Sequence, residues 1–152
     1  MGARPEAFEA ALAALGRRER TGAELASWLT RRGYEAAEIE AAIERLTRLG
    51  QLDDERFARR YAEDKRELRG WGAERVCDAL LARGIAGAIA EGVAAGDSRE
   101  AQVGRARDLL VARGRSLAGD ADRARALGYL TRRGYEYEIA YEAIRLAARD
   151  AA

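Results

Sequence analysis

The heptapeptide Leu-Thr-Arg-Arg-Gly-Tyr-Glu occupies residues 29–35 and recurs letter for letter at residues 130–136. A degenerate copy, Leu-Leu-Ala-Arg-Gly-Ile-Ala, lies between them at residues 80–86. The copies are about 50 residues apart, which is a spacing typical of helical repeat arrays. The heptapeptide therefore predicts three similar units along the chain.

Each copy has the residue order expected where a helix ends. Apolar residues at helical spacing precede the glycine, and a basic residue closes the last turn, where it suits the helix dipole. Gly33, Gly84 and Gly134 fit the left-handed position that follows a helix, and the apolar residue after each would fold back on the last turn. We interpret the heptapeptide as a helix stop that builds a turn, and not as a ligand site.

Helical patterns also flank each copy. Ile39, Ala42, Ile43 and Leu46 form an apolar stripe after the first copy, and residues 139–147 give a similar stripe after the third. Each unit opens with a further helix, and the residues that we assign to these opening helices are 8–18, 55–68 and 99–113.

Residues that cap helix N-termini stand where several of these helices should begin. Thr21 and Glu24 have the spacing of a capping box, and Asp53 can cap the helix that follows it. Either Ser98 or Asp97 can open the helix of the third unit.

These patterns predict an all-α fold of three tandem three-helix repeats, with units at residues 1–50, 51–97 and 98–152. Pro5 is the only proline, so nothing in the remaining chain interrupts long helices. A unit of about 50 residues is expected to bury its apolar face poorly on its own. We therefore expect neighbouring units to stack into an elongated curved array.

The composition excludes several kinds of chemistry. Cys77 is the only cysteine and there is no histidine, so an intramolecular disulfide and histidine-based catalysis are excluded. The chain has no phosphate-binding loop motif, and its carboxylates alternate with arginines at the spacing of solvated helix faces. We expect no enzyme, no cofactor and no metal. Without a signal peptide or an apolar stretch of about 20 residues, we expect a cytoplasmic protein and no membrane contact.

Any affinity for an anionic partner must come from local patches, because the net charge is only +1. The segment Arg69-Gly70-Trp71-Gly72 is the most unusual of these. Trp71 is either pinned against a neighbouring helix in a tight turn, or it is an exposed anchor flanked by Arg69 and Arg75, since tryptophan and arginine often carry interface energy. The candidate partner-binding or DNA-binding residues are Arg56, Arg59, Arg60, Arg66, Arg69, Trp71, Arg75, Arg83, Arg132 and Arg133.

Several blocks resemble one family. Residues 50–58, Gly-Gln-Leu-Asp-Asp-Glu-Arg-Phe-Ala, resemble the G-Y-[IL]-D-D-x-x-[FY] block of RecX regulatory proteins. Residues 69–85 resemble the family's second block, and residues 18–29 and 133–135 are similar to its outer elements. The chain departs from the pattern at Gln51, where the family has an aromatic residue, and at Ala73, where it has proline.

This resemblance implies a fold of tandem three-helix repeats and a regulatory function. RecX proteins bind the RecA recombinase filament on DNA and mostly inhibit its ATPase, strand-exchange and co-protease activities in DNA repair and the SOS response. The implied partner is therefore the RecA filament, with weak direct binding to single- or double-stranded DNA. Two alternatives from the residues alone stay open, namely a general nucleic-acid-binding helical module and a helical adaptor for another protein.

Overall fold

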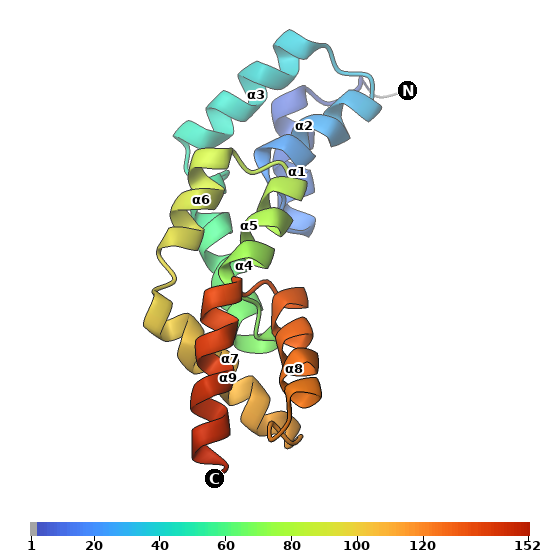
Figure 1. The fold of residues 1–152 in the computed structure, drawn as a ribbon. Coiled ribbons are helices and arrows are strands. Elements are labelled where there is room, and N and C mark those ends of the chain that lie inside the picture. Colours follow the sequence, from blue (N-terminus) through green and yellow to red (C-terminus); the bar gives the residue numbers. More distant parts are fainter. Residues whose placement is uncertain (1–2) are drawn as a thin grey trace.

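The computed structural model describes residues 3–152, and this part of the chain contains nine α-helices and no β-strand. The helices are α1 (Ala7–Arg17), α2 (Gly22–Arg31), α3 (Ala36–Arg48), α4 (Asp54–Arg69), α5 (Ala73–Ala82), α6 (Gly87–Ala95), α7 (Arg99–Arg113), α8 (Asp120–Arg132) and α9 (Tyr137–Asp150). The prediction of an all-α fold is confirmed. Figure 1 shows an elongated, bent array with the two ends of the chain at opposite ends.

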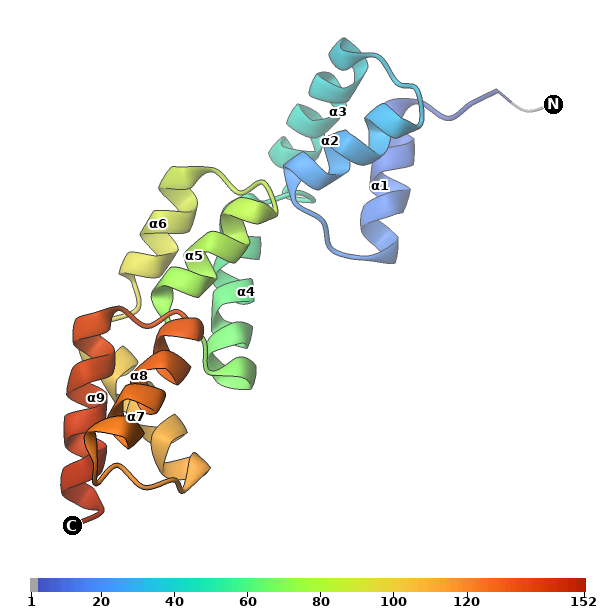
Figure 2. The ribbon, with the colours of Figure 1, turned by 45° about the vertical axis from the view of Figure 1, so that its right-hand side comes forward.

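Three separate hydrophobic clusters hold the array, each built from three consecutive helices: α1–α3, α4–α6 and α7–α9. We call these the first, second and third bundles. Leu29, Leu80 and Leu130, the first residue of each heptapeptide copy, are fully buried, one in each cluster. Figures 1 and 2 show α2, α5 and α8 along one side of the array and α3, α6 and α9 along the other. The unit boundaries at residues 50/51 and 97/98 stay our proposal.

The heptapeptide ends a helix in all three places, as predicted. Gly33, Gly84 and Gly134 adopt positive φ angles of 86°, 81° and 96°. The backbone N–H of the next residue donates to the carbonyl of the leucine five positions earlier, which is the bond that closes such a helix end. The apolar side chain that follows each glycine is buried.

The predicted caps are also present. The Thr21 hydroxyl accepts from the N–H of Glu24 and the Glu24 carboxylate accepts from the N–H of Thr21, so the capping box is complete. Asp53 caps α4 through the N–H of Arg56. Of the two candidates for α7, Ser98 is the cap.

Each bundle has its own hydrophobic cluster within the array, while the poor burial expected of an isolated unit stays a prediction. Leu25, Leu29 and Leu46 belong to the cluster of the first bundle and are fully buried in the array. Ala11 and Ala14 of α1 belong to the same cluster and are also fully buried. The buried apolar residues thus cluster bundle by bundle, and further contacts join the bundles.

The joint between the first and second bundles is made of polar and backbone contacts. The Thr21 hydroxyl donates to the Arg83 carbonyl over 2.8 Å, and the Arg83 guanidinium binds both carboxylate oxygens of Glu24 at 2.8 and 3.2 Å. A Cβ atom added to Gly84 would lie 2.4 Å from the Cβ of Ala23. The glycine of the heptapeptide thus both ends a helix and permits a neighbouring bundle to approach.

The joint between the second and third bundles repeats this arrangement. The N–H of Gly72 donates to the Arg133 carbonyl over 2.8 Å, and the N–H of Glu74 donates to the Gly134 carbonyl over 3.0 Å. A Cβ atom on Gly72 would lie 2.5 Å from the Gly134 carbonyl oxygen. In both joints the start of one bundle's second helix contacts the heptapeptide turn of the next bundle.

At the turn of the first bundle, the N-terminal segment makes the kind of contact that the preceding bundle makes at the other two turns. The Arg4 guanidinium donates to the Arg32 carbonyl over 3.2 Å, and the Tyr34 hydroxyl donates to the Pro5 carbonyl over 2.6 Å. At the third turn, the Tyr135 hydroxyl donates in the same way to the Gly70 carbonyl of the preceding bundle. The segment at Arg4 and Pro5 therefore takes the place of a preceding bundle.

Candidate partner and nucleic-acid interface

A basic hollow of about 580 Å³ lies at the joint between the second and third bundles. We call it the joint hollow. The side chains that line it are five cations and two aromatic rings, without any acid: Lys65, Arg69, Trp71, Arg75, Tyr129, Arg132 and Arg133. Residues from α4, α5 and α8 meet there because the joint brings the end of α4 and the start of α5 against the end of α8.

Trp71 has features of both predicted roles, the side chain pinned in a tight turn and the anchor flanked by arginines. Its ring is half-buried and meets Tyr61 edge-on, with 6.4 Å between the ring centroids, which ties it to the core of the second bundle. On the side of the hollow, the Arg75 guanidinium lies 4.3 Å and the Lys65 ammonium 5.0 Å from the centroid of the indole. These are cation–π distances, so the indole attracts both cations. At the same time, the edge-on contact with Tyr61 keeps the ring attached to the core of the second bundle.

Tyr129 is the second aromatic ring of the hollow, and the sequence prediction missed it. The guanidinium of Arg113 lies 3.9 Å and that of Arg133 4.7 Å from its ring centroid. A signal was present, because Tyr129 directly precedes the third heptapeptide as Trp28 directly precedes the first. Lys65 was also left out of the predicted site.

Backbone carbonyls fix the arginines around the hollow. Arg133 donates to the Arg69 carbonyl over 2.7 Å, and Arg75 donates to the Arg132 carbonyl over 3.3 Å. The buried Tyr135 hydroxyl reaches the Gly70 carbonyl at 2.8 Å, and burial raises the pKa of this tyrosine, so it remains a hydrogen-bond donor. Two cross-joint hydrogen bonds therefore hold Arg75 and Arg133 in place before any ligand arrives, and the bond from Tyr135 fixes the joint beside them.

A buried ion cluster supports the same joint. Asp97, whose side chain is 2% exposed, lies 2.9 Å from a guanidinium nitrogen of Arg105 and 3.3 Å from Nε of Arg66. Burial opposes the charge of Arg105, but its interactions with Asp97 and Tyr135 together outweigh burial, so the pKa of Arg105 is raised. Arg105 also donates to the Trp71 carbonyl over 3.5 Å, which connects the cluster to the hollow.

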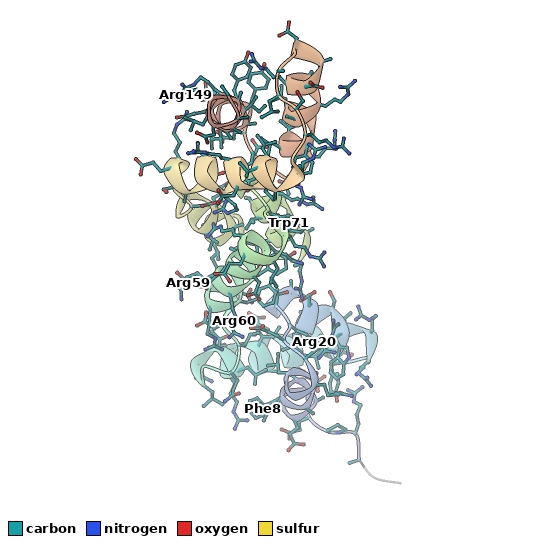
Figure 3. All side chains as sticks on the ribbon, turned by 90° about the horizontal axis from the view of Figure 1, so that it is seen from below. Phe8, Arg20, Arg59, Arg60, Trp71 and Arg149 are labelled. Carbon is teal, nitrogen blue, oxygen red and sulfur yellow. The ribbon has the colours of Figure 1, made fainter. Side chains whose placement is uncertain are left out.

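The structure brings together five of the ten predicted site residues: Arg69, Trp71, Arg75, Arg132 and Arg133. The other five lie elsewhere. Arg66 and Arg83 form the internal pairs described above, Arg56 donates to the Gly50 carbonyl, and Arg59 and Arg60 form exposed pairs with Glu55 and Glu19. Figure 3 shows Arg59 at the left of the array, with Trp71 and Arg20 to the right of it.

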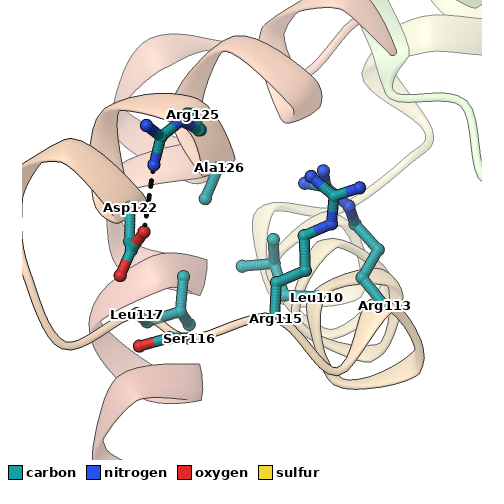
Figure 4. A pocket seen from close by; sticks show the side chains of 8 residues that line it. All are labelled: Leu110, Arg113, Arg115, Ser116, Leu117, Asp122, Arg125 and Ala126. Atoms are coloured by element: carbon teal, nitrogen blue, oxygen red, sulfur yellow. Dashed lines mark hydrogen bonds and ion pairs between the residues drawn. The ribbon is translucent and has the colours of Figure 1, made fainter.

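A second, smaller hollow of about 180 Å³ lies between the end of α7 and the start of α8 (Figure 4). Asp122 pairs there with Arg125 at 3.1 Å, and none of the lining residues is aromatic. Its cations are partly neutralised, so it is a weaker candidate for an anionic partner than the joint hollow.

Two further features are absent from residues 3–152. No three His, Cys, Asp or Glu side chains in this range converge on a position that could hold a metal ion. None of the helices in the same range is long and apolar enough to cross a membrane.

Comparison with known proteins agrees with this architecture. Residues 7–46 match the family profile described as "RecX, first three-helix domain", and residues 53–93 match "RecX, second three-helix domain". "Regulatory protein RecX" of Thermus thermophilus is 36% identical over 145 residues, covering 95% of this chain and 94% of that protein. The protein of the same name from Pelodictyon phaeoclathratiforme is 32% identical over 143 residues, covering 93% of this chain and 89% of that protein.

A crystal structure of RecX from Lactobacillus salivarius has the same fold, with a TM-score of 0.84 over 96% of both chains at 21% sequence identity. Fold and profile matches together define the class, an all-α protein built from three-helix domains. The chain belongs to the RecX family, whose members are named regulatory proteins.

Proposed function

We propose that this protein is a cytoplasmic, non-catalytic regulator that binds the RecA recombinase filament on DNA and mostly inhibits its ATPase, strand-exchange and co-protease activities. The observation that carries the proposal is the joint hollow, in which five cations and two aromatic rings meet without an acid. Membership of a family of regulatory proteins supports a role in regulation.

The physical argument is one of local charge. With a net charge of only +1, the molecule as a whole attracts anions weakly, so a patch free of acids determines where an anionic partner docks. Guanidinium groups bind carboxylates and phosphates through paired hydrogen bonds, and aromatic rings add contact area at little entropic cost. A filament of protein and DNA offers both kinds of anion along its length, and an elongated array suits such a partner.

The test is recombinase on single-stranded DNA with ATP, assayed for ATP hydrolysis and strand exchange with and without equimolar protein. Arg69 and Arg132 are exposed in the hollow, so Arg69→Gln with Arg132→Gln removes two charges with little effect on packing. We expect this double variant to inhibit about tenfold less, a loss of about 1.4 kcal/mol in binding.

The matched control is Arg48→Gln with Arg145→Gln, which removes the same charge from exposed positions on α3 and α9. This control should inhibit like the unchanged protein. No effect of the unchanged protein on either recombinase activity would overturn the proposed function. Equal losses in the two double variants would show that overall charge, and not the joint hollow, is responsible.

A further inference from the structure

A groove of about 780 Å³ lies between α8 and α9 of the third bundle. We call it the α8–α9 groove. Its base is apolar and is formed by Leu127 of α8 and Ile144 of α9, with Ala124 and Ala148 beside them. Figures 1 and 2 show the two helices side by side at the end of the array that carries the C-terminus. A further helix laid between them would pack as the helices of a bundle pack on one another.

Two exposed tyrosines of α9 form one edge of this groove. Tyr137 and Tyr141 are 60% and 59% exposed, and their ring centroids lie 5.5 Å apart. Large apolar side chains that gather on a surface beside an apolar groove mark a site of interaction with another molecule. Tyrosine is also one of the residue types that most often carry the energy of a protein interface.

The repeats provide an internal comparison for these two positions. Counted from the leucine of each heptapeptide copy, the first two bundles have a small residue where Tyr137 stands and a glutamate where Tyr141 stands. The matching residues are Ala36 and Glu40 in α3, and Gly87 and Glu91 in α6. All three bundles form a helix here, so the fold does not require aromatic rings at these positions. The tyrosine pair is therefore a feature of the third bundle that folding alone does not explain.

The rim of the groove is positively charged. Its charged side chains are three guanidinium groups and one carboxylate, namely Arg123, Arg145, Arg149 and Asp120. Two acids of the same helix α9, Glu142 and Asp150, pair instead with arginines of α7. The rim therefore attracts acidic side chains that approach along the edges of the apolar base.

We propose that the α8–α9 groove binds an acidic amphipathic helix of a protein partner. Apolar side chains spaced one helical turn apart fill the base against Leu127, Ile144 and the tyrosine rings, as in other complexes of a helix in a groove. Glutamate or aspartate side chains on the flanks of that helix contact the arginines of the rim. The aliphatic base favours a peptide over a nucleic acid, because phosphates and base edges would lose hydration there without gaining hydrogen bonds.

This groove is separate from the joint hollow. Leu127 of the groove and Tyr129 of the hollow are two positions apart in α8, so they face different sides of that helix. Figure 3 shows Arg149 of the rim well apart from Trp71 of the hollow. Both sites can therefore be occupied at once, and substitution of Arg145 in the groove leaves the recombinase assay unaffected.

The test uses two synthetic peptides of identical composition, each of about 18 residues and labelled with fluorescein. In the first, leucine and phenylalanine share one face of a helix and glutamate occupies the rest. In the second, the same residues are reordered so that no apolar face forms. Titration with the whole protein, followed by fluorescence anisotropy, should give saturable binding of the first peptide and binding of the second that is at least about tenfold weaker.

Tyr137→Ala with Tyr141→Ala should weaken binding of the first peptide about tenfold, because it removes the aromatic edge of the groove. Tyr137→Phe with Tyr141→Phe is the matched control, since it keeps both rings, and it should bind like the unchanged protein. Thermal melts followed by circular dichroism verify that each variant is folded.

The charge of the rim is tested separately. Arg123→Gln with Arg149→Gln should lower the affinity and make it less dependent on salt, because salt screens the attraction between exposed charges. Arg31→Gln with Arg48→Gln removes the same charge from exposed positions in the first bundle and should leave both quantities almost unchanged.

Any of three outcomes would overturn the proposal: equal binding of the two peptides or binding of neither, equal losses in the alanine and phenylalanine variants, or displacement of the bound peptide by equimolar oligothymidylate. The last would assign the groove to a nucleic acid and not to a protein. Because the assay contains no recombinase, its failure leaves the proposed regulation standing, and failure of the recombinase assay leaves this site standing.

Discussion

Gly72 and Gly119 occupy the same position in two helices, since each is the N-cap of the second helix of its bundle with extended backbone, at φ −82° and −112°. Their surroundings differ. A Cβ atom on Gly72 would meet the backbone of Gly134 and Tyr135 at 2.5 to 2.7 Å, whereas nothing lies within 4 Å of a Cβ atom on Gly119. Comparing substitutions of the two glycines therefore separates two effects. Both substitutions change a helix N-cap, but only the one at Gly72 disturbs the close approach of two bundles.

We expect Gly72→Ala to lower the free energy of unfolding by about 1 to 3 kcal/mol more than Gly119→Ala does, because the backbone at the joint must move to admit the methyl group. Urea denaturation followed by circular dichroism measures both. Equal effects would mean that the joint adapts without strain.

Glu24 gives the first joint a dependence on pH. Burial opposes its ionisation, but hydrogen bonds from Arg83 and Thr21 outweigh burial, so the pKa of Glu24 lies below its ordinary value. A carboxyl group with a lowered pKa stabilises the folded state above its unfolded pKa, and this contribution is lost as the pH falls through the folded pKa.

Glu24→Gln should therefore be less stable than the unchanged protein at pH 7, and the difference should shrink as the pH is lowered below the ordinary range of a glutamate. Urea midpoints across an acid series measure it. A difference that stays constant with pH would show that the ion pair with Arg83 contributes nothing.

At the scale of single elements, the helix ends were the most predictable feature, because their signals are local. The heptapeptide with its glycine and the cap at Thr21 act within five residues of one another, so sequence spacing alone indicates them. The second role of Gly84, its close approach to Ala23, depends on a contact between residues 61 positions apart. No local pattern encodes such a contact.

Part of the candidate site could also be predicted, because some of its residues lie close together in the sequence. Arg69, Trp71 and Arg75 stand close together in the sequence and were found, but the joint also brings in Tyr129 from the next bundle. Arg66 and Arg83 look like surface cations in the sequence, and only the fold shows that they pair with Asp97 and Glu24.

The hydroxyl groups of Tyr34 and Tyr135 donate equivalent hydrogen bonds at two heptapeptide turns, but the two bonds differ in burial. Tyr135 donates to the Gly70 carbonyl in a buried bond, while Tyr34 donates to Pro5 in a partly buried one. Tyr135→Phe leaves a buried carbonyl unpaired and should cost about 1 to 3 kcal/mol, against about 0.5 to 1.5 kcal/mol for Tyr34→Phe. Denaturation of both variants measures the difference, and a larger loss for Tyr34→Phe would contradict the role given to burial.

At the scale of the whole molecule, three bundles with separate cores are connected by polar joints. Such joints add little apolar stabilisation between bundles. We therefore expect a substitution that destabilises one bundle to leave distant bundles folded. Asp97→Asn removes the carboxylate that pairs with Arg66 and Arg105 and should cost about 3 to 5 kcal/mol, as is usual when one partner of a buried ion pair is removed.

Hydrogen exchange should locate that loss. In Asp97→Asn we expect faster exchange in α4 and α7, on either side of the second joint, with α1–α3 still protected. Equal acceleration throughout the chain would show that the bundles unfold as one cooperative unit.

The most direct test of the central claim, that the array docks on a recombinase filament through the joint hollow, is electron cryo-microscopy of a filament on single-stranded DNA saturated with this protein. We predict density for three helical bundles along the filament, with the α2, α5 and α8 side and the joint hollow facing it. Undecorated filaments, or contact made through the α3, α6 and α9 side, would contradict the account.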